Sequence, residues 1–294
     1  MTTIEIKNVD FGYDENHIVL HNINLDIREP GLYCVVGPNG VGKSTLIHCI
    51  NKILAPKGGV VMMNGEDVKN ITIKQMSKKV GYVPYSANDS FPLSVVDTVM
   101  MGRHPHSKLG SLDNDLRIVY DTLQMLGITH LAMRSFNELS AGQHQKVMLA
   151  RGLAQEPEVL LLDEPTSNLD VRHQIEVTKL LKRLTQEKGI LTIMISHDIN
   201  IAAKYSDQIV MMHQGKIFAT GTPEEVITEE NLRAVYGVES KIVDDEGSPH
   251  VILRDSIPLD TEDVDSVRSP RMAESLRDVK YVSESEDQAV GESS

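Results

Sequence analysis

The stretch GPNGVGKST, at residues 37–45, decides the fold of this chain. It fits the pattern G-x-x-x-x-G-K-[ST] at every fixed position, namely Gly37, Gly42, Lys43 and Ser44. The short apolar run GLYCVV, at 31–36, precedes it, and the helical pattern LIHCINKIL, at 46–54, follows it. A strand, a glycine-rich loop and a helix in this order form the context that a phosphate-binding loop requires. The sequence therefore predicts a site for a nucleoside triphosphate.

The residue types of this loop suit phosphate chemistry. Its glycines let backbone N–H groups turn inward around phosphate oxygens, and the following helix directs its positive N-terminus at them. We expect Lys43 to bridge the β- and γ-phosphates, Ser44 to ligate Mg²⁺, and Thr45 to lie beside the α-phosphate. The other predicted nucleotide-binding residues of the loop are Pro38, Asn39, Gly40 and Val41. The competing interpretation is a glycine-rich turn that opens a helix.

The stretch VLLLDE, at 159–164, is an apolar strand pattern that ends in two carboxylates. An acidic residue at the carboxyl end of a strand beside a phosphate loop can hold Mg²⁺ through water, and we assign Asp163 this role. Glu164 is then placed to polarise the attacking water as general base. Taken alone, an Asp-Glu pair after a strand indicates a turn, but the phosphate loop favours the catalytic interpretation.

The stretch LSAGQ, at 139–143, precedes a helical pattern and has two compatible interpretations. Ser140 and Gln143 have the spacing of a capping box, which is a common structural device at helix starts. Alternatively, the Ser140 hydroxyl, the amide of Gly142 and the helix N-terminus form a second grip on a γ-phosphate.

Composition indicates a protein with an aliphatic core. Of 294 residues, 40% are hydrophobic and 4% are aromatic, and Trp is absent, so Val, Ile, Leu and the 13 Met must fill the interior. Cys34 and Cys49 lie among apolar neighbours, which predicts buried free thiols. Two cysteines exclude a disulfide scaffold and a four-Cys zinc site.

Charge is unevenly distributed along the chain. The formal net charge of −13 argues against a nucleic-acid-binding protein with a broad basic surface. Residues 255–294 hold 11 acidic and 4 basic side chains, are rich in Ser and contain few aromatic residues. We expect a disordered acidic tail over 251–294, after a folded domain over 1–250. Within the tail, MAESLRDVKY at 272–281 has the pattern of one short helix.

The order of apolar patterns predicts an α/β fold. Alternating apolar residues between 4 and 27 predict antiparallel strands, and the region at about 86–155 is mostly helical. From 159 to 213, continuous apolar strands alternate with helices, which indicates a parallel sheet covered on both faces. We therefore predict an N-terminal antiparallel β subdomain, a parallel-sheet core and a helical subdomain.

No apolar stretch is long enough for a transmembrane helix. The start, MTTIEIKNVDFGY, lacks the basic and apolar regions of a signal peptide. We therefore expect a cytosolic chain, unless a partner holds it at a membrane.

With its motifs in this order, the chain resembles P-loop ATPases of the ATP-binding-cassette (ABC) family over about residues 1–250. The matching motifs are the phosphate loop at 37–45, the signature LSAGQ at 139–143, the Walker B stretch at 159–164, the D-loop SNLD at 167–170 and the switch histidine His197 in ISHD. The resemblance implies ATP hydrolysis with Mg²⁺ as cofactor.

Further roles are implied by the resemblance alone. Tyr13 would stack on adenine, and His197 would contact the γ-phosphate. The family works as a head-to-tail pair of copies, so Asp170 would act across the dimer interface. Each ATP would then lie between the Lys43 loop of one copy and Ser140, Ala141, Gly142 and Gln143 of the other.

Two further stretches resemble importers for iron–siderophore chelates, haem and cobalamin. They are VVDTVMMGRHPH at 95–106 and GTPEEVITEENLRAVYGVES at 221–240. The resemblance implies a separate transmembrane permease, an extracytoplasmic substrate-binding protein, and a peripheral location on the cytoplasmic face of the membrane. The alternatives are an importer of another metal or vitamin, and a non-transport ABC ATPase. The single cassette without heptads or a basic surface favours transport.

Two positions depart from the family pattern. Ala141 replaces a glycine of the signature, and the loop should tolerate it if its φ is negative. Tyr85, in VGYVPYSAND, stands where the family has a Gln that approaches Mg²⁺ and water and whose loop couples to the permease. This predicts a defect in the outer metal shell or in coupling. The alternative is that backbone and water complete the shell while the ring packs against the permease.

Overall fold

The computed structural model describes residues 2–15, 17–85, 93–106, 111–167 and 169–257. The chain divides into two compact units, Met1–Asp255 and Ser256–Ser294. The elements described below belong to the first unit, apart from the last residue of the final strand. The helix predicted at 272–281 lies outside the described residues.

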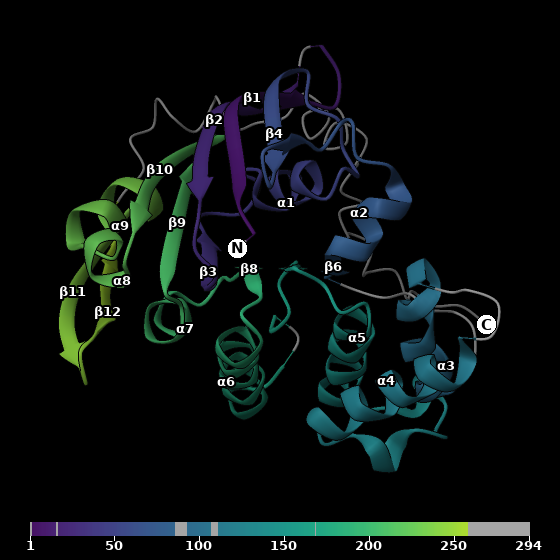
Figure 1. Ribbon diagram of the computed structural model, residues 1–294. Helices are drawn as coiled ribbons and strands as arrows, with labels where there is room; N and C mark the ends of the chain where they lie inside the picture. Colours follow the sequence, from purple (N-terminus) through teal and green to yellow (C-terminus); the bar gives the residue numbers. More distant parts are fainter. Residues whose placement is uncertain (1, 16, 86–92, 107–110, 168, 258–294) are drawn as a thin grey trace, which may run out of the picture. The chain divides into compact units, whose positions relative to one another are not determined.

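A six-stranded sheet forms the centre of the first unit within the described part of the chain (Figure 1). Its strands are β3 (Leu32–Val36), β6 (Val80–Val83), β7 (Val159–Leu162), β8 (Leu191–Ile195), β9 (Gln208–His213) and β10 (Lys216–Gly221). Their spatial order is β10-β9-β3-β8-β7-β6, and every neighbouring pair is parallel except β9 and β10. The predicted parallel-sheet core is thus confirmed. The carboxyl ends of β3, β8, β7 and β6 lie at one edge, which is where ligands bind in sheets of this kind.

The sheet separates two hydrophobic cores, because successive side chains of a strand point to opposite faces. Val35 and Leu161 face the core that includes the N-terminal strands and α1 (Lys43–Ile50). Cys34 and Leu162 face the core that is shared with the later helices. Both cysteines are buried free thiols, as predicted, and burial raises the pKa of each to about 12.

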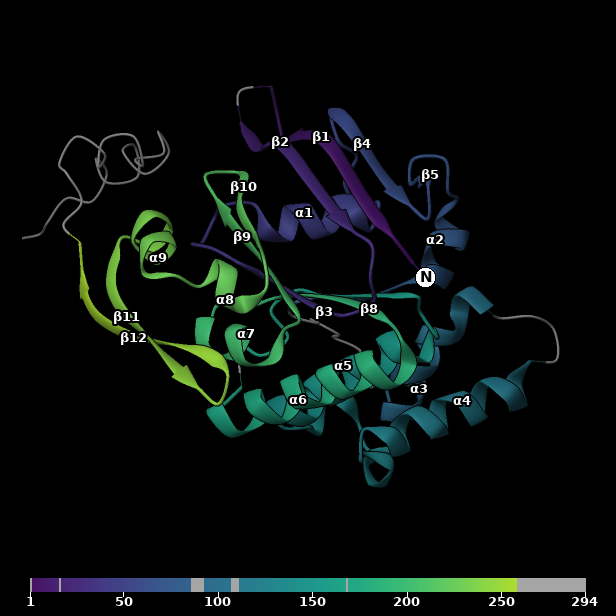
Figure 2. The ribbon, with the colours of Figure 1, turned by 60° about the vertical axis from the view of Figure 1, so that its left-hand side comes forward.

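An antiparallel sheet covers one of these cores. Among the described residues its strands are β1 (Ile4–Gly12), β2 (Ile18–Ile27), β4 (Gly58–Met63) and β5 (Glu66–Asp67), in the order β2-β1-β4-β5. The pairing of β1 with β2 confirms the antiparallel strands predicted between 4 and 27. Figures 1 and 2 show α1 between this sheet and the six-stranded one, so the phosphate loop leads into a buried helix.

A group of helices follows β6 in the chain. They are α3 (Val95–Met100), α4 (Leu112–Met125), α5 (Ala141–Ala154) and the short 3₁₀ helices η1 (Met101–His106), η2 (Thr129–Leu131) and η3 (Phe136–Glu138), while α2 (Ile73–Lys79) precedes β6. Helices α3, α4 and α5 pack against one another in Figure 1. They lie within the stretch predicted as a helical subdomain at about 86–155, of which 86–92 and 107–110 lie outside the described residues.

The remaining elements follow β7 or close the first unit. They are α6 (Val171–Lys188), α7 (Ile199–Tyr205), α8 (Pro223–Val226), α9 (Glu229–Tyr236), and the hairpin of β11 (Val238–Asp245) and β12 (Ser248–Ser256). No helix in the described ranges combines the length and apolar character that crossing a membrane requires.

Strand β12 corrects the predicted start of the tail at residue 251. The side-chain amide of Asn200 accepts a hydrogen bond from the Val251 N–H at 2.7 Å and donates one to the Val251 carbonyl at 3.2 Å. Val251 is 5% exposed and belongs to the helical-side core. The strand continues to Ser256. The sequence did not predict this attachment, because the residues that follow are acidic.

Candidate functional site

The loop between β3 and α1 needs glycine at two positions. Gly37 has a φ of +149°, and a Cβ on it would lie 2.3 Å from the carbonyl oxygen of Met212. Gly42 has a φ of +100° and caps α1, and its Cβ would lie 2.7 Å from Leu20 Cδ2. Since an L-residue at either position would clash and be strained, these glycines determine the path of the loop.

The side chain of Lys43 lies inside this loop. The residue is 5% exposed, and its Nζ donates hydrogen bonds to the carbonyls of Gly37 and Pro38, both at 2.8 Å. Burial lowers the pKa of Lys43, and the nearby carboxylates of Glu164 and Asp163 oppose this shift. The loop therefore holds an ammonium group against two of its own backbone carbonyls, where a polyphosphate would find a cation.

A cavity of about 280 Å³, called the Lys43 cavity below, lies against the loop. Its lining includes Tyr13, His17, Asn39, Lys43, Thr45 and Glu164. The Tyr13 hydroxyl lies 3.5 Å from Thr45 Oγ1, and its ring packs edge-on against Phe11 with centroids 5.2 Å apart. Because Tyr13 is 63% exposed, a ring face is free to stack on a base while the loop holds phosphates.

Ser44 and Asp163 meet at the edge of the sheet. Ser44 Oγ donates a hydrogen bond of 2.9 Å to Asp163 Oδ1, and the Asp163 N–H donates to the Val83 carbonyl at 2.9 Å. Loss of hydration on burial raises the pKa of Asp163, against the lowering effect of the Ser44 hydrogen bond. A hydroxyl and a carboxylate are the hard oxygen donors that Mg²⁺ prefers, and a cation stabilises a desolvated carboxylate. The pair therefore fits a magnesium ion.

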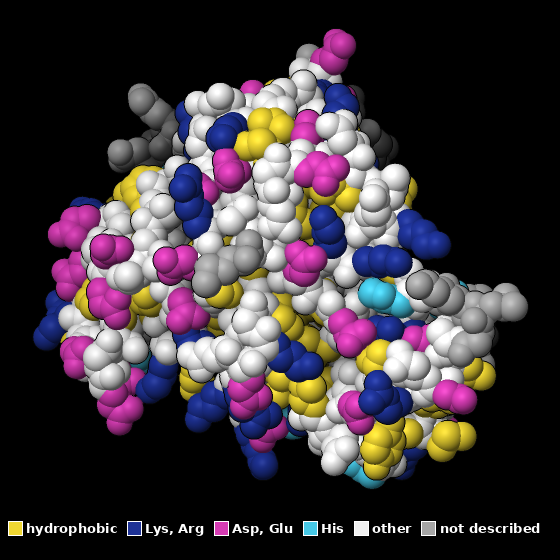
Figure 3. All heavy atoms as spheres, viewed as in Figure 1, with side chains coloured by type: hydrophobic (Ala, Val, Ile, Leu, Met, Phe, Trp, Pro, Cys, Tyr) yellow, Lys and Arg dark blue, Asp and Glu magenta, His cyan; other side chains and the backbone are white. Residues whose placement is uncertain are grey.

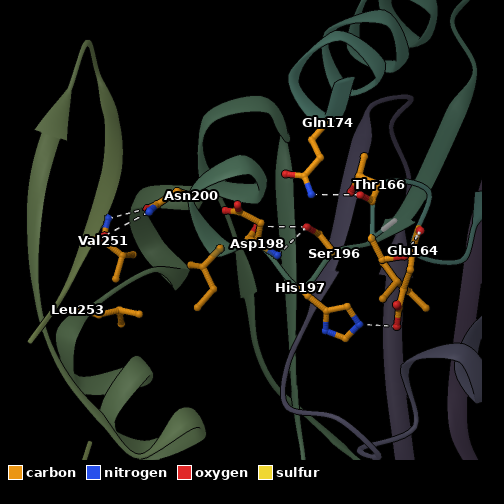
Figure 4. A pocket seen from close by; sticks show the side chains of 12 residues that line it. Glu164, Thr166, Gln174, Ser196, His197, Asp198, Asn200, Val251 and Leu253 are labelled. Atoms are coloured by element: carbon orange, nitrogen blue, oxygen red, sulfur yellow. Dashed lines mark hydrogen bonds and ion pairs between the residues drawn. The ribbon is translucent and has the colours of Figure 1, made fainter. Parts of the chain in front are cut away.

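Glu164 lines the cavity beside the phosphate loop, and it also lines a cavity of about 530 Å³ together with His197. His197 Nε2 and Glu164 Oε1 form an ion pair, and Figure 4 shows the two side chains pointing toward one another. Glu164 has a φ of +51°, a backbone conformation that is rare for residues other than glycine and is often found at functional sites. The carboxylate of Glu164 lines the Lys43 cavity, a position from which it can accept a proton from water.

The loop that carries His197 is held at both ends. His197 follows β8, and Ser196 Oγ accepts from the Asp198 N–H at 3.2 Å. Asp198 caps α7 by accepting from the Ile201 N–H at 2.9 Å. The imidazole thus projects from a short, fixed connection between a strand and a helix (Figure 4).

The predicted capping box of LSAGQ is confirmed. Ser140 N–H donates to Gln143 Oε1 at 3.1 Å, and Gln143 N–H donates to Ser140 Oγ at 3.4 Å. Ala141 is the first residue of α5 and is absent from the positive-φ residues of the described chain, so alanine fits there without strain. Ala141 lines a separate cavity of about 160 Å³ rather than the Lys43 cavity.

Tyr85 lines the same 160 Å³ cavity, together with Glu164 and Ala141. It follows β6 and is 48% exposed. The residues around the Lys43 cavity do not include it. Tyr85 therefore lies beside the start of α5 and beside Glu164.

Two residues of α6, His173 and Gln174, make contacts that the sequence did not predict. His173 carries no sequence signal of a functional role, yet it pairs with Asp170 and lies close to Gly142. Gln174 Nε2 donates to the Thr166 carbonyl at 3.1 Å, as Figure 4 shows. The available signal was the spacing of Asp170 to His173, which predicts a helix cap and nothing more.

Comparisons with known proteins identify the family. A family model described as ABC transporter matches residues 20–167. An uncharacterized ABC transporter ATP-binding protein of Methanocaldococcus jannaschii is 43% identical over 249 residues, covering 85% of this chain and 97% of that protein. The chain belongs to the ATP-binding proteins of ABC transporters.

The names of other ABC relatives state the cargo of their transporters. The ferric enterobactin transport ATP-binding protein of Escherichia coli is 35% identical over 250 residues, covering 84% of this chain and 92% of the relative. The hemin import ATP-binding protein of Bordetella avium is 36% identical over 232 residues, covering 76% and 88%.

Solved ABC structures share the fold. A metal-chelate type ABC transporter in an inward-facing conformation has a TM-score of 0.74 and 28% identity, covering 86% of this chain and 97% of its own. A dimeric bacterial ABC transporter cassette has a TM-score of 0.67 and 29% identity, covering 74% and 98%. The predicted ABC ATPase fold is confirmed, and the chain is an ATPase whose hydrolysis is coupled to transport.

Proposed function

We propose that this ABC ATPase powers import of an iron chelate, haem or cobalamin through a separate permease. The stretches at 95–106 and 221–240 and the named relatives support this cargo class. The main observation behind this proposal is that Glu164 lines the Lys43 cavity and pairs with His197. An acid–base pair beside a phosphate-binding loop is what hydrolysis of ATP requires.

This arrangement supports the following proposed roles for the site residues. Tyr13 stacks on adenine, and the loop from Gly37 to Thr45 wraps the phosphates with backbone N–H groups. Lys43 neutralises charge on the β- and γ-phosphates. Glu164 accepts a proton from the attacking water, and His197 Nε2 orients that carboxylate and reaches the γ-phosphate.

We propose that Ser44 and Asp163 hold Mg²⁺, with Asp163 acting through water. The ion, when bound, neutralises charge on the phosphates as a Lewis acid. The support is the 2.9 Å contact of the two side chains at the end of the sheet. The side chain of Tyr85 offers a phenol in place of the amide oxygen of Gln, and a phenol is a poorer ligand for a hard cation.

The second grip on ATP comes from another copy of the chain. Ser140, Ala141, Gly142 and Gln143 do not line their own Lys43 cavity, which favours a head-to-tail dimer in which they meet the partner's nucleotide. A similar cassette is known as a dimer. Asp170 then acts across the interface.

Further partners are the transmembrane permease and an extracytoplasmic substrate-binding protein, with the ATPase on the cytoplasmic face of the membrane. A nucleic-acid partner is not proposed. Figure 3 shows many Asp and Glu side chains over the region of α8, α9 and the hairpin. The first turns of both helices are acidic. Such a surface repels phosphate backbones.

The test is reconstitution of the ATPase with its permease and binding protein in vesicles. The candidate cargoes are a ferric siderophore, haem and cobalamin. Molybdate or zinc serves as the comparison cargo. Uptake of one candidate that depends on ATP and is lost with Glu164→Gln supports the proposal. ATP-dependent uptake of the comparison cargo alone would contradict the cargo class.

A further inference from the structure

His173 forms a contact on each side of its ring. On one side lies Asp170, the residue that caps α6. Asp170 Oδ1 accepts from the His173 N–H at 2.9 Å, and His173 Nδ1 lies 2.9 Å from both carboxylate oxygens. These hydrogen bonds lower the pKa of Asp170, so the carboxylate is charged and held in place.

The opposite contact of the ring is with the signature stretch. A Cβ placed on Gly142 would lie 3.0 Å from His173 Cδ2 and 3.3 Å from its Cγ. The imidazole therefore lies close to the backbone of α5 in its first turn, where a Cβ at position 142 would crowd the ring unless it moved by a few tenths of an ångström. A single side chain thus joins the D-loop carboxylate to the signature glycine within one chain.

Neighbouring contacts reinforce this link. Gln174 donates to the Thr166 carbonyl at 3.1 Å and so holds the segment between β7 and α6. One turn further along both helices, Lys146 Nζ lies 3.6 Å from Glu176 Oε2. Leu169 and Ala141 line the same 160 Å³ cavity. The start of α5 and the start of α6 are therefore connected at several points.

We propose that His173 is a positioning residue that holds Asp170 and Gly142 together as one unit, presented to the nucleotide of the partner copy. The inference rests on the proposed head-to-tail dimer. Histidine suits both contacts, because Nδ1 donates to a carboxylate while the flat ring fits against a glycine backbone. Neither Asp170 nor Gly142 lines the Lys43 cavity of its own chain.

Two substitutions separate the contacts. His173→Asn keeps an N–H donor near the position of Nδ1 but removes most of the ring. His173→Phe keeps a ring against Gly142 but removes the donor. His173→Ala removes both, and His130→Asn, at an exposed histidine of η2, is the matched control. All are made in the Glu164→Gln chain, in which ATP is bound and not consumed.

Two quantities are measured for each variant. One is the dissociation constant of the ATP-bound dimer, by analytical ultracentrifugation with Mg²⁺. The other is the affinity of the monomer for a fluorescent ATP analogue, at protein concentrations below dimerisation. We expect His173→Ala to weaken the dimer about tenfold or more, and His173→Asn and His173→Phe to weaken it less. Monomer affinity and the melting temperature should match those of His130→Asn.

Other results would overturn the inference. Unchanged dimerisation in all three His173 variants would show that the contacts have no role in the pair. A parallel loss of monomer affinity and melting temperature would show a merely structural role. If the Glu164→Gln parent does not dimerise with ATP, the proposed dimer is wrong, and the inference falls with it.

Discussion

Ser44 Oγ donates a 2.9 Å hydrogen bond to Asp163 Oδ1, although 119 positions separate the two residues in the chain. Ser44 follows β3 and Asp163 follows β7, with β8 between these strands in the sheet. Since parallel strands end at a common edge, the fold itself brings the hydroxyl and the carboxylate together. The contact joins the phosphate loop to the strand that also positions Glu164.

The pKa of Asp163 links this contact to stability. Burial raises the pKa above 3.8, so the folded chain binds the proton more tightly than the unfolded chain. Stability from this group is therefore present at low pH and is lost as pH rises from 3.8 through the raised pKa. Asp163→Asn should raise the melting temperature at pH 7 by about 2–4 °C, the shift that roughly 1 kcal/mol gives in a domain of this size. Scanning calorimetry without nucleotide measures it.

The same variant should lose function as it gains stability. Asn lacks the charge that would hold Mg²⁺, so the Mg²⁺-dependent part of ATP affinity should disappear in isothermal titration. Asp121→Asn, at an exposed position of α4, is the control and should change neither quantity. Lower stability of Asp163→Asn at pH 7 would contradict the assigned cause of the pKa shift.

Glu164→Gln should retain ATP binding and lose roughly two or more orders of magnitude in hydrolysis. The amide keeps the shape of the side chain but cannot accept the proton, and ATP should then favour the dimer. Phosphate release and size-exclusion chromatography measure the two effects. Glu187→Gln, on the exposed part of α6, is the matched control. Near-normal turnover in Glu164→Gln would mean that another group is the base.

Lys43→Ala should weaken nucleotide binding itself, by roughly tenfold or more. The change removes the ammonium that faces the phosphates, and hydrogen bonds to charged groups are worth about 1.5–3 kcal/mol. Equilibrium titration with a fluorescent ATP analogue measures the affinity. Lys179→Ala, at an exposed position of α6, controls for the loss of a lysine elsewhere. Equal affinity for the two variants is the result that the assignment cannot accommodate.

Tyr85→Gln should leave the Mg²⁺ dependence of ATPase activity unchanged and should alter transport. Tyr85 lines the cavity of Ala141 rather than that of Lys43 and Ser44, so we expect a coupling role. ATPase rates are measured at saturating and at limiting Mg²⁺, with uptake assayed in parallel. A gain in apparent Mg²⁺ affinity would instead support a metal-shell defect. If neither quantity changes, the position has no function in this protein.

Truncation after Ile257 should leave the melting temperature within about 1 °C of the full chain. The removed segment is acidic and poor in apolar anchors, so it has little to bury. Truncation after Gly247 is the contrast, because it removes β12 with the buried Val251. That variant should melt several degrees lower. A large drop in melting temperature after truncation at Ile257 would show that the tail packs on the rest of the chain.

Local signals in the sequence were sufficient for the phosphate loop and the capping box. Gly37 and Gly42 have positive φ values, a local backbone geometry that a nine-residue pattern reports, although the atoms that a Cβ would meet belong to Met212 and Leu20. Ser140 and Gln143 bond to each other across one helical turn, so their spacing alone predicts the cap. Continuous apolar strands likewise predicted the parallel sheet, because burial on both faces determines their composition.

The antiparallel pairing of β4 with β1, the attachment of β12 and the role of His173 were decided by tertiary structure. The Asn200 amide satisfies the backbone of Val251 across 51 positions, and no local pattern records such a partner. His173 acquires its second contact because α5 and α6 start beside one another. Short-range periodicity specifies which face of an element is buried, but which element covers that face depends on how the whole chain packs.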